Sequence, residues 1–186
     1  MEKKFILTDK FVINSFGIKL FQIKCTKSFK YAQKGDFGGY VEKEGNLDQE
    51  NDAWVFGNAR VFGNARVSSN ARVSGDAWVS DNARVSGDAW VFGNAWVSSN
   101  AWVSGNADIE NDNEHCGFDG FGSCNRHTHA YMTKEKKVEI ICGCFRGSIE
   151  EFEKKVEETH SGTVYEKQYK SIINVIKIKF GLTDFT

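Results

Sequence analysis

The sequence contains no proline and only two methionines among its 186 residues. Proline lacks the backbone N–H that strand ladders need, so its absence suits a chain dominated by hydrogen-bonded strands. The formal net charge is −1, so no strong field draws the chain toward nucleic acid or a membrane surface. Sustained apolar runs are also missing, including near Met1, and we expect neither a signal peptide nor a membrane span.

Cysteine and histidine are absent from the middle of the chain. The five cysteines are an odd number, and none lies within residues 36–113. This pattern argues against a secreted disulfide framework and predicts reduced thiols in a cytoplasm. The four histidines stand at positions 115, 127, 129 and 160, all after this region.

The region from Asp52 to Asn111 consists of ten six-residue units without insertion or deletion. The shared pattern is Asn or Asp, Ala, Trp or Arg, Val, Ser or Phe, and Gly or Ser. A period of six keeps no face of a helix apolar, but Ala-x-Val fits a short strand with Ala and Val on one side. Gly and Asn then enter left-handed turn conformations at the least cost. Short strands separated by corners predict a solenoid.

This pattern resembles the left-handed β-helix of the hexapeptide-repeat, trimeric-acyltransferase-like superfamily. An aliphatic residue followed four positions later by a small one occurs at Val55/Ala59, at Val61/Ala65 and at each later pair. The residue after the aliphatic one is Ser or Phe, where that family often has Gly. The resemblance implies triangular coils of about eighteen residues, so that residues eighteen apart stack.

Stacking at this interval sorts the outward residues into three columns. The first contains Trp54, Arg72 and Trp90, the second Arg60, Trp78 and Trp96, and the third Arg66, Arg84 and Trp102. Coils lie about 4.8 Å apart, which brings Arg and Trp neighbours within cation–π distance. These nine residues are the candidate binding residues, because Trp and Arg are typical of protein-binding hot spots and of surfaces that stack nucleobases.

Aromatic residues make the first two columns too apolar to remain in water. We expect a sister chain or the terminal segments to cover them, while the third column, with Arg66 and Arg84, stays exposed. The corners also stack, and a ladder is predicted for Asn46, Asn64, Asn82 and Asn100.

The flanks of the repeat predict two smaller parts. Residues 1–35 alternate as two or three antiparallel strands, with turns at 8–10 and 14–17, and form a hairpin cap on the repeat region, 36–113. Residues 114–186 contain a hairpin of 126–132 and 138–142, then helices from 148 to about 159 and from 164 to 180. The predicted fold is therefore mainly β: a left-handed parallel β-helix with a β-hairpin cap and a C-terminal α+β (ββαα) module.

Two segments outside the repeat carry a further resemblance. The lead-in at 34–42 and the string at 142–147 are similar to parts of small hexapeptide proteins encoded by phages and prophages. Many of those proteins have no assigned activity, so the resemblance implies that a phage or prophage encodes the chain but does not imply a particular enzymatic reaction.

Residues of metal-ligand type gather within 29 positions after the repeat: Cys116, Cys124, His127, His129, Cys142 and Cys144. Tetrahedral zinc needs four such groups, but the spacing matches no standard Cys-x₂-Cys pair. A structural zinc and small buried cysteines without metal both stay open, and no other cofactor is expected. Cys142 or Cys144 with His160 offers the residue types of a nucleophile and base, without supporting spacing.

Acyltransferases of the superfamily use a histidine as general base at a cleft between subunits. The repeat contains no histidine and no inserted loop, so we expect no catalytic residues. The prediction is a cytoplasmic, non-catalytic homo-oligomer, dimer or trimer, that is encoded by a phage and blocks a host factor such as a component of bacterial defence. Three alternatives remain: acyl transfer to a small amine or sugar, sequestration of a small nucleotide ligand, and a structural or virion-associated role.

Overall fold

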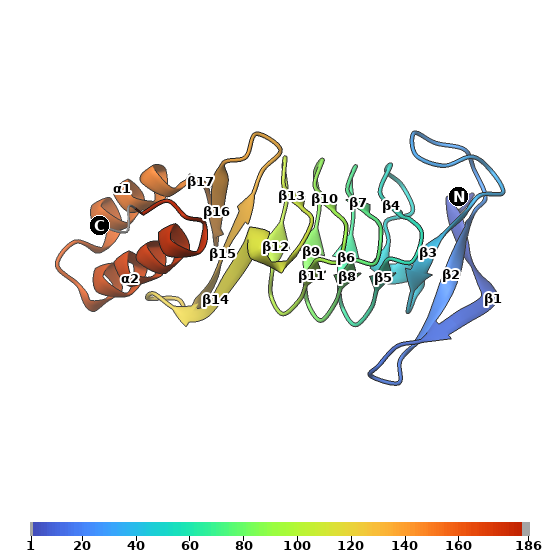
Figure 1. Cartoon of the computed structure of the whole chain (residues 1–186), viewed down its shortest axis with the longest axis horizontal. Coiled ribbons are helices and arrows are strands. Elements are labelled where there is room, and N and C mark those ends of the chain that lie inside the picture. The colour runs from blue at the N-terminus through green and yellow to red at the C-terminus, as the bar shows by residue number, and fades with distance from the viewer. Residues whose placement is uncertain (1, 184–186) are drawn as a thin grey trace. The chain divides into compact units, whose positions relative to one another are not determined.

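The computed structural model describes residues 2–183, and Met1 and residues 184–186 lie outside the described part. The chain divides into two compact units, Met1–Asp112 and Asn113–Thr186. Each unit has its own sheets and its own buried core (Figure 1).

The first unit begins with three antiparallel strands, β1 (Phe5–Ile13), β2 (Lys19–Cys25) and β3 (Phe37–Val41). The predicted turn at 14–17 is confirmed, because Oδ1 of Asn14 accepts hydrogen bonds from two backbone N–H groups at 3.0 and 2.9 Å. The predicted turn at 8–10 is wrong. Those residues form a bulge inside β1, where the pairing with β2 shifts between Leu7 and Phe11.

A single 3-10 turn, η1 (Glu44–Asn46), leads to ten two-residue strands: β4 (Trp54–Val55), β5 (Arg60–Val61), β6 (Arg66–Val67), β7 (Arg72–Val73), β8 (Trp78–Val79), β9 (Arg84–Val85), β10 (Trp90–Val91), β11 (Trp96–Val97), β12 (Trp102–Val103) and β13 (Asp108–Ile109). Parallel pairing joins every third strand, in the orders β4-β7-β10-β13, β5-β8-β11 and β6-β9-β12. The successive coils are visible in Figure 1. The predicted three-sided parallel coil with eighteen-residue stacking is thereby confirmed.

The hairpin cap and the coil share one sheet. Strand β3 pairs antiparallel with β2 and parallel with β5, where Val41 lies opposite Val61. The antiparallel strands therefore continue into the parallel ladder and satisfy the backbone groups that the first coil would otherwise leave unpaired.

Alanine and valine fill the inside of the coil. Each repeat alanine from Ala53 to Ala107 and each repeat valine from Val55 to Val103 is at most 4% exposed. Glycine occupies most corners with positive φ, and Ser69, Asp81 and Ser99 adopt φ of 60°, 57° and 59° at the equivalent position. The stacked neighbours hold these three residues in a conformation that an isolated chain disfavours.

The asparagine ladder is shorter than predicted. The side-chain amide of Asn64 donates to Asn82 at 3.2 Å, and that of Asn82 donates to Asn100 at 3.3 Å. Asn46 is fully buried and instead donates to the backbone carbonyls of Gly63 and Ala65 at 3.2 and 2.8 Å. The prediction for Asn46 is wrong because η1 takes it out of the corner register.

The second unit is a four-stranded antiparallel sheet with two helices. After a short 3-10 turn, η2 (Asp112–Glu114), come β14 (His115–Phe121), β15 (Arg126–Met132), β16 (Val138–Cys142), β17 (Phe145–Ser148), α1 (Ile149–His160) and α2 (Val164–Lys179). The predicted hairpin and both helices are confirmed, and Ser148 caps α1 through reciprocal hydrogen bonds with Glu151. Sequence reasoning missed β14 and β17, which lie on either side of that hairpin.

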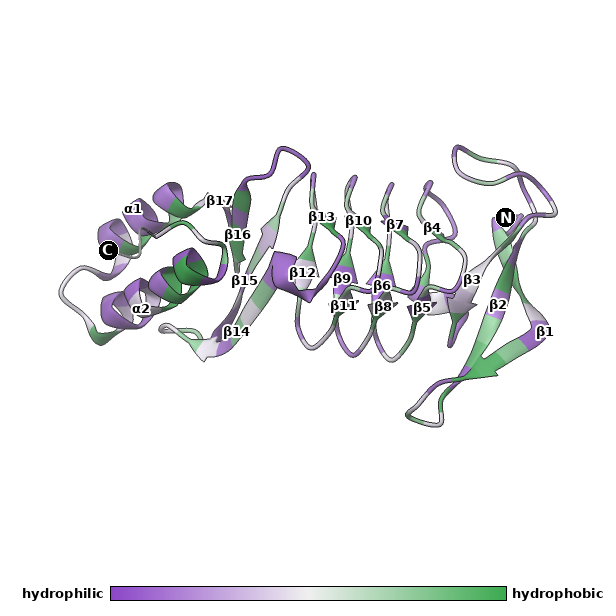
Figure 2. Cartoon of the chain, viewed as in Figure 1, coloured by the Kyte–Doolittle hydropathy of each residue, from purple (hydrophilic) through white to green (hydrophobic). Residues whose placement is uncertain are grey.

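The core of the second unit lies between the helices and one face of the sheet. Phe152 and Val156 of α1 and Ile176 of α2 pack in one buried cluster with Ala130 and Ile140. Figure 2 shows hydrophobic and hydrophilic residues alternating along both helices, as expected where one side packs. Among the described residues, no helix is long and apolar enough to cross a membrane.

Candidate functional site

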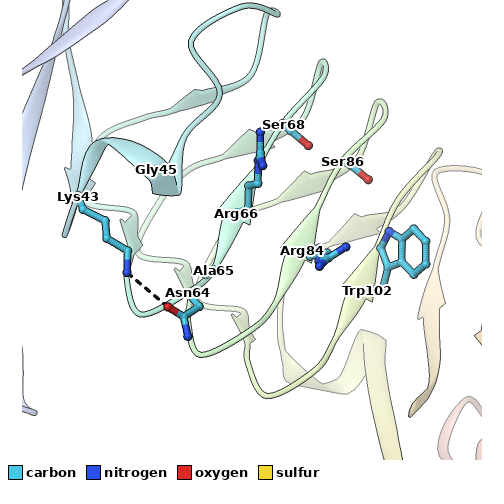
Figure 3. Close-up of a pocket in the computed structure, with 9 residues that line it drawn as sticks. All are labelled: Lys43, Gly45, Asn64, Ala65, Arg66, Ser68, Arg84, Ser86 and Trp102. Carbon is cyan, nitrogen blue, oxygen red and sulfur yellow. Dashed lines mark hydrogen bonds between the residues drawn. The ribbon is translucent and has the colours of Figure 1, made fainter. Parts of the chain in front are cut away.

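A basic groove of about 560 Å³ lies over β6, β9 and β12, on the third face of the coil (Figure 3). We call it the third-face groove. Its lining consists of Lys43, Gly45, Asn64, Ala65, Arg66, Ser68, Arg84, Ser86 and Trp102, all from the first unit.

Strand alternation explains why these side chains line the surface. Val67 and Val85 point into the core and are 0% exposed, so the arginines before them and the serines after them point outward. In-register pairing places Arg66 opposite Arg84, and Arg84 opposite Trp102. Two cations and one aromatic ring therefore follow one another along a single column.

Arg66 and Arg84 form a like-charge pair without a counter-ion in the described part of the chain. Both side chains are exposed, and neither guanidinium takes part in a hydrogen bond or ion pair with a described residue. Register pairing places Arg66 and Arg84 on neighbouring strands about 4.8 Å apart, so their like charges repel each other, although solvent weakens the repulsion between exposed groups. The groove lining contains no carboxylate to offset this repulsion.

The arginines of the other two columns lie on aromatic rings instead. The guanidinium carbon of Arg60 is 5.1 Å from the ring centroid of Trp78, and that of Arg72 is 4.4 Å from the ring centroid of Trp90. The predicted Arg–Trp contacts are confirmed in these two columns. The third column differs because Arg66 lies opposite another arginine, Arg84, in the strand register.

A third cation stands at the edge of the groove. Nζ of Lys43 donates to Oδ1 of Asn64 at 3.4 Å, the contact drawn in Figure 3. Asn64 is held in turn by its place in the corner ladder. This neutral partner positions the Lys43 ammonium without cancelling its charge, so the whole rim stays positive.

Four overlapping segments match the repeat family described as YdcK beta solenoid repeat, at residues 53–69, 65–81, 77–91 and 83–99. These residues form the coil from β4 to β11. The chain is a β-solenoid repeat protein. No curated protein is similar enough to give a match.

The N-terminal segment covers much of the first two columns of the β-solenoid. Trp54 is 1% exposed, and its ring centroid lies 5.3 Å from that of Phe29. Phe16, in the turn after β1, contacts Phe62, Trp78 and Trp96 at centroid distances of 6.2, 6.2 and 6.0 Å. The expected cover is therefore formed by this chain's own N-terminal segment, and a covering sister chain stays a prediction.

The Cys and His residues of the predicted zinc site lie on opposite faces of the second unit's sheet. Alternation along β15 places His127 and His129 on one face and Thr128 on the other, where its hydroxyl donates to Sγ of Cys142 at 3.2 Å. Cys116 lies opposite Ala130 on the side of the helix-facing core, while Cys124 and Cys144 are exposed in turns. No group of three or more His, Cys, Asp or Glu among the described residues is arranged to hold a metal ion.

Protonation also works against metal binding at Cys116 and sets the state of His129. Burial raises the pKa of the Cys116 thiol to about 11, and a metal ligand must be the thiolate. Burial, together with the neighbouring His115 and His127, lowers the pKa of His129 well below 6.5. Nδ1 of His115, which is partly buried, lies 3.2 Å from Nε2 of the buried His129, within hydrogen-bond distance.

Sequence reasoning placed Arg66, Arg84 and Trp102 on the third face together with the serines that follow the two arginines, but it did not place Lys43 or Gly45 there. Ser68 and Ser86 stand eighteen residues apart, so the repeat spacing contained the signal for them. Lys43 precedes the regular repeat, and only η1 and the contact with Asn64 bring it to the rim.

Proposed function

We propose that the β-solenoid is a non-catalytic binding protein whose third-face groove captures an anionic group of its partner. The observation that supports this proposal is the exposed pair of Arg66 and Arg84, stacked in register without a counter-ion among the described residues. Such a pair costs free energy in the unbound protein, and an anion that both guanidinium groups grip removes that cost.

The groove side chains favour binding over turnover. Arginine, lysine, asparagine, serine and tryptophan line it, and the lining contains neither a histidine nor a carboxylate that could serve as a general base. Every histidine lies in the second unit. Acyl transfer therefore finds no support in this groove. The phage origin and the block of a host factor stay predictions, as does the homo-oligomer.

Replacement of both Arg66 and Arg84 by glutamine tests the proposal. With inorganic tripolyphosphate as the probe, isothermal titration calorimetry at an ionic strength of about 0.1 M, where charges more than about 10 Å apart are largely screened, is expected to show binding to the unchanged chain. The double variant is expected to bind at least about tenfold more weakly, since hydrogen bonds to charged groups contribute roughly 1.5–3 kcal/mol each.

The matched control replaces Arg60 and Arg72 by glutamine, which changes the net charge equally on the other two columns. Its affinity for tripolyphosphate should stay within about twofold, because long-range effects of exposed charges are small. Equal losses in both double variants, or no measurable binding to the unchanged chain, would refute the proposal.

A further inference from the structure

We infer that the anion is a single nucleoside polyphosphate, with its base stacked on Trp102 and its phosphates bound by Arg84 and Arg66. This inference rests on the proposed function and adds the class of ligand. It follows from the order of the third column, in which two cations precede one exposed aromatic ring along a straight line.

The two arginines suit neighbouring phosphates. Each guanidinium presents a planar fork of N–H donors that binds phosphate oxygens in pairs, and the two arginines lie on successive coils. The hydroxyls of Ser68 and Ser86 line the same groove and offer further donors. Figure 3 shows both serines beside the arginine column.

Trp102 provides the stacking surface. Its side chain is 42% exposed and lines the groove beyond Arg84. Every base has a flat π-face that stacks on an indole, whereas an inorganic anion gains nothing from one. Trp96 is equally exposed at 42%, but it belongs to the second column and does not line the third-face groove.

The dimensions limit the ligand to one nucleotide. Arg66, Arg84 and Trp102 lie on three successive coils, so only two coil steps separate Arg66 from Trp102. The groove volume of about 560 Å³ lies in the range of about 300–1,000 Å³ that is usual for small-ligand sites. With Lys43 the groove offers three cations, enough for one polyphosphate but too few for a long nucleic-acid backbone.

Calorimetry on the full chain with ADP, pyrophosphate and adenosine tests this inference, without divalent cations that would mask the phosphates. ADP is expected to bind at least about fivefold more tightly than pyrophosphate, since stacking on an aromatic ring contributes about 5- to 100-fold per base. Adenosine, which lacks phosphate, is expected to bind at least about tenfold more weakly than ADP.

The variant Trp102→Leu is expected to weaken ADP binding by about 5- to 100-fold and to leave pyrophosphate binding unchanged. Trp96→Leu is the matched control, since Trp96 has the same exposure in another column, and it should leave both affinities within about twofold. Thermal unfolding of each variant shows that the fold is retained.

Three results would overturn the inference. If ADP and pyrophosphate bind equally tightly and Trp102→Leu changes neither affinity, the groove binds an anion without recognising a base. The nucleotide inference would then be wrong, and the proposed function would stand. Affinity for single-stranded oligonucleotides that rises with their length would identify a polymer as the ligand. If neither ADP nor pyrophosphate binds while tripolyphosphate does, the groove does not take a nucleoside diphosphate, and only the anion site of the proposed function remains.

Discussion

At the scale of the residue, the solenoid depends on positions where almost no side chain fits. Gly38 and Gly39 in β3 lie against the first coil: a Cβ on Gly39 would come within 2.7 Å of the carbonyl oxygen of Ala59 and of Cγ1 of Val55. The same close approach allows β3 to pair with β5 and to continue the ladder. These glycines are needed for space, since neither of them has a positive φ.

Gly39→Ala is therefore expected to destabilise the first unit by about 1–3 kcal/mol through overpacking against the backbone. Gly45→Ala is the control, because a Cβ there would meet nothing within 4 Å and φ is not positive. It should be neutral or stabilising by up to about 1 kcal/mol. Urea unfolding followed by tryptophan fluorescence compares the two variants, and equal effects would show that the contact with Ala59 is not limiting.

At the scale of the element, strands of two residues have little stability of their own. Each coil strand is held by the parallel partners before and after it, so the stability of the solenoid belongs to the stack. The helices of the second unit differ, because local sequence fixes where they begin. Ser148 accepts a hydrogen bond from the N–H of Glu151 at 3.2 Å, and Glu151 accepts one from the N–H of Ser148 at 2.8 Å.

Ser148→Ala removes one half of this capping box and is expected to cost about 1 kcal/mol of stability. Ser171→Ala is the matched control. Its hydroxyl only donates to the carbonyl of Lys167 within α2, and alanine has the higher helix propensity, so a neutral or slightly stabilising effect is expected. Helical circular dichroism during thermal unfolding measures both, and a destabilising Ser171→Ala would contradict this account.

At the scale of the whole molecule, the two units differ in the kinds of side chain that they present. The first unit holds the third-face groove and all the tryptophans, whereas the second holds all the histidines and four of the five cysteines. Because all the histidines lie in the second unit, we expect the pH dependence of stability near neutral pH to come from that unit. The cationic side chains of the groove are arginine and lysine, residue types that keep their charge through the neutral range.

Acid is expected to destabilise the protein through His129. Because burial lowers its pKa well below 6.5 in the folded chain, the unfolded chain binds this proton first as the pH falls. Stability is therefore complete above about pH 6.5 and decreases below it, by at most about 1.4 kcal/mol for each pH unit. Unfolding midpoints measured between pH 7.5 and 5 should show this decrease.

The variant His129→Gln tests this prediction. Its loss of stability between pH 6.5 and 5 should be smaller than that of the unchanged chain. The unchanged chain, measured in parallel over the same pH range, is the reference. An unchanged slope in His129→Gln would show that another group takes up the proton.

The sequence by itself determined the coil, the three columns and the helix starts. The Ala, Val and corner residues recur every six positions, and this single period is enough to predict the coil. The beginning of α1 depends on hydrogen bonds between Ser148 and a residue three positions later, so it too is encoded locally. The bulge in β1 and the position of Asn46 were beyond prediction, since each depends on pairing with strands distant in sequence.

Only part of the candidate site could be predicted from the sequence. Residue types and spacing placed Arg66, Arg84 and Trp102 in one column, but they did not show that Arg66 and Arg84 lack a counter-ion among the described residues. Only the tertiary structure decided that Phe16 and Phe29 cover the aromatic groups elsewhere, that Lys43 reaches the third face, and that the cysteines and histidines after the repeat stand apart. Periodicity fixes which residues stack, whereas burial and charge compensation depend on what non-repeating segments bring against each face.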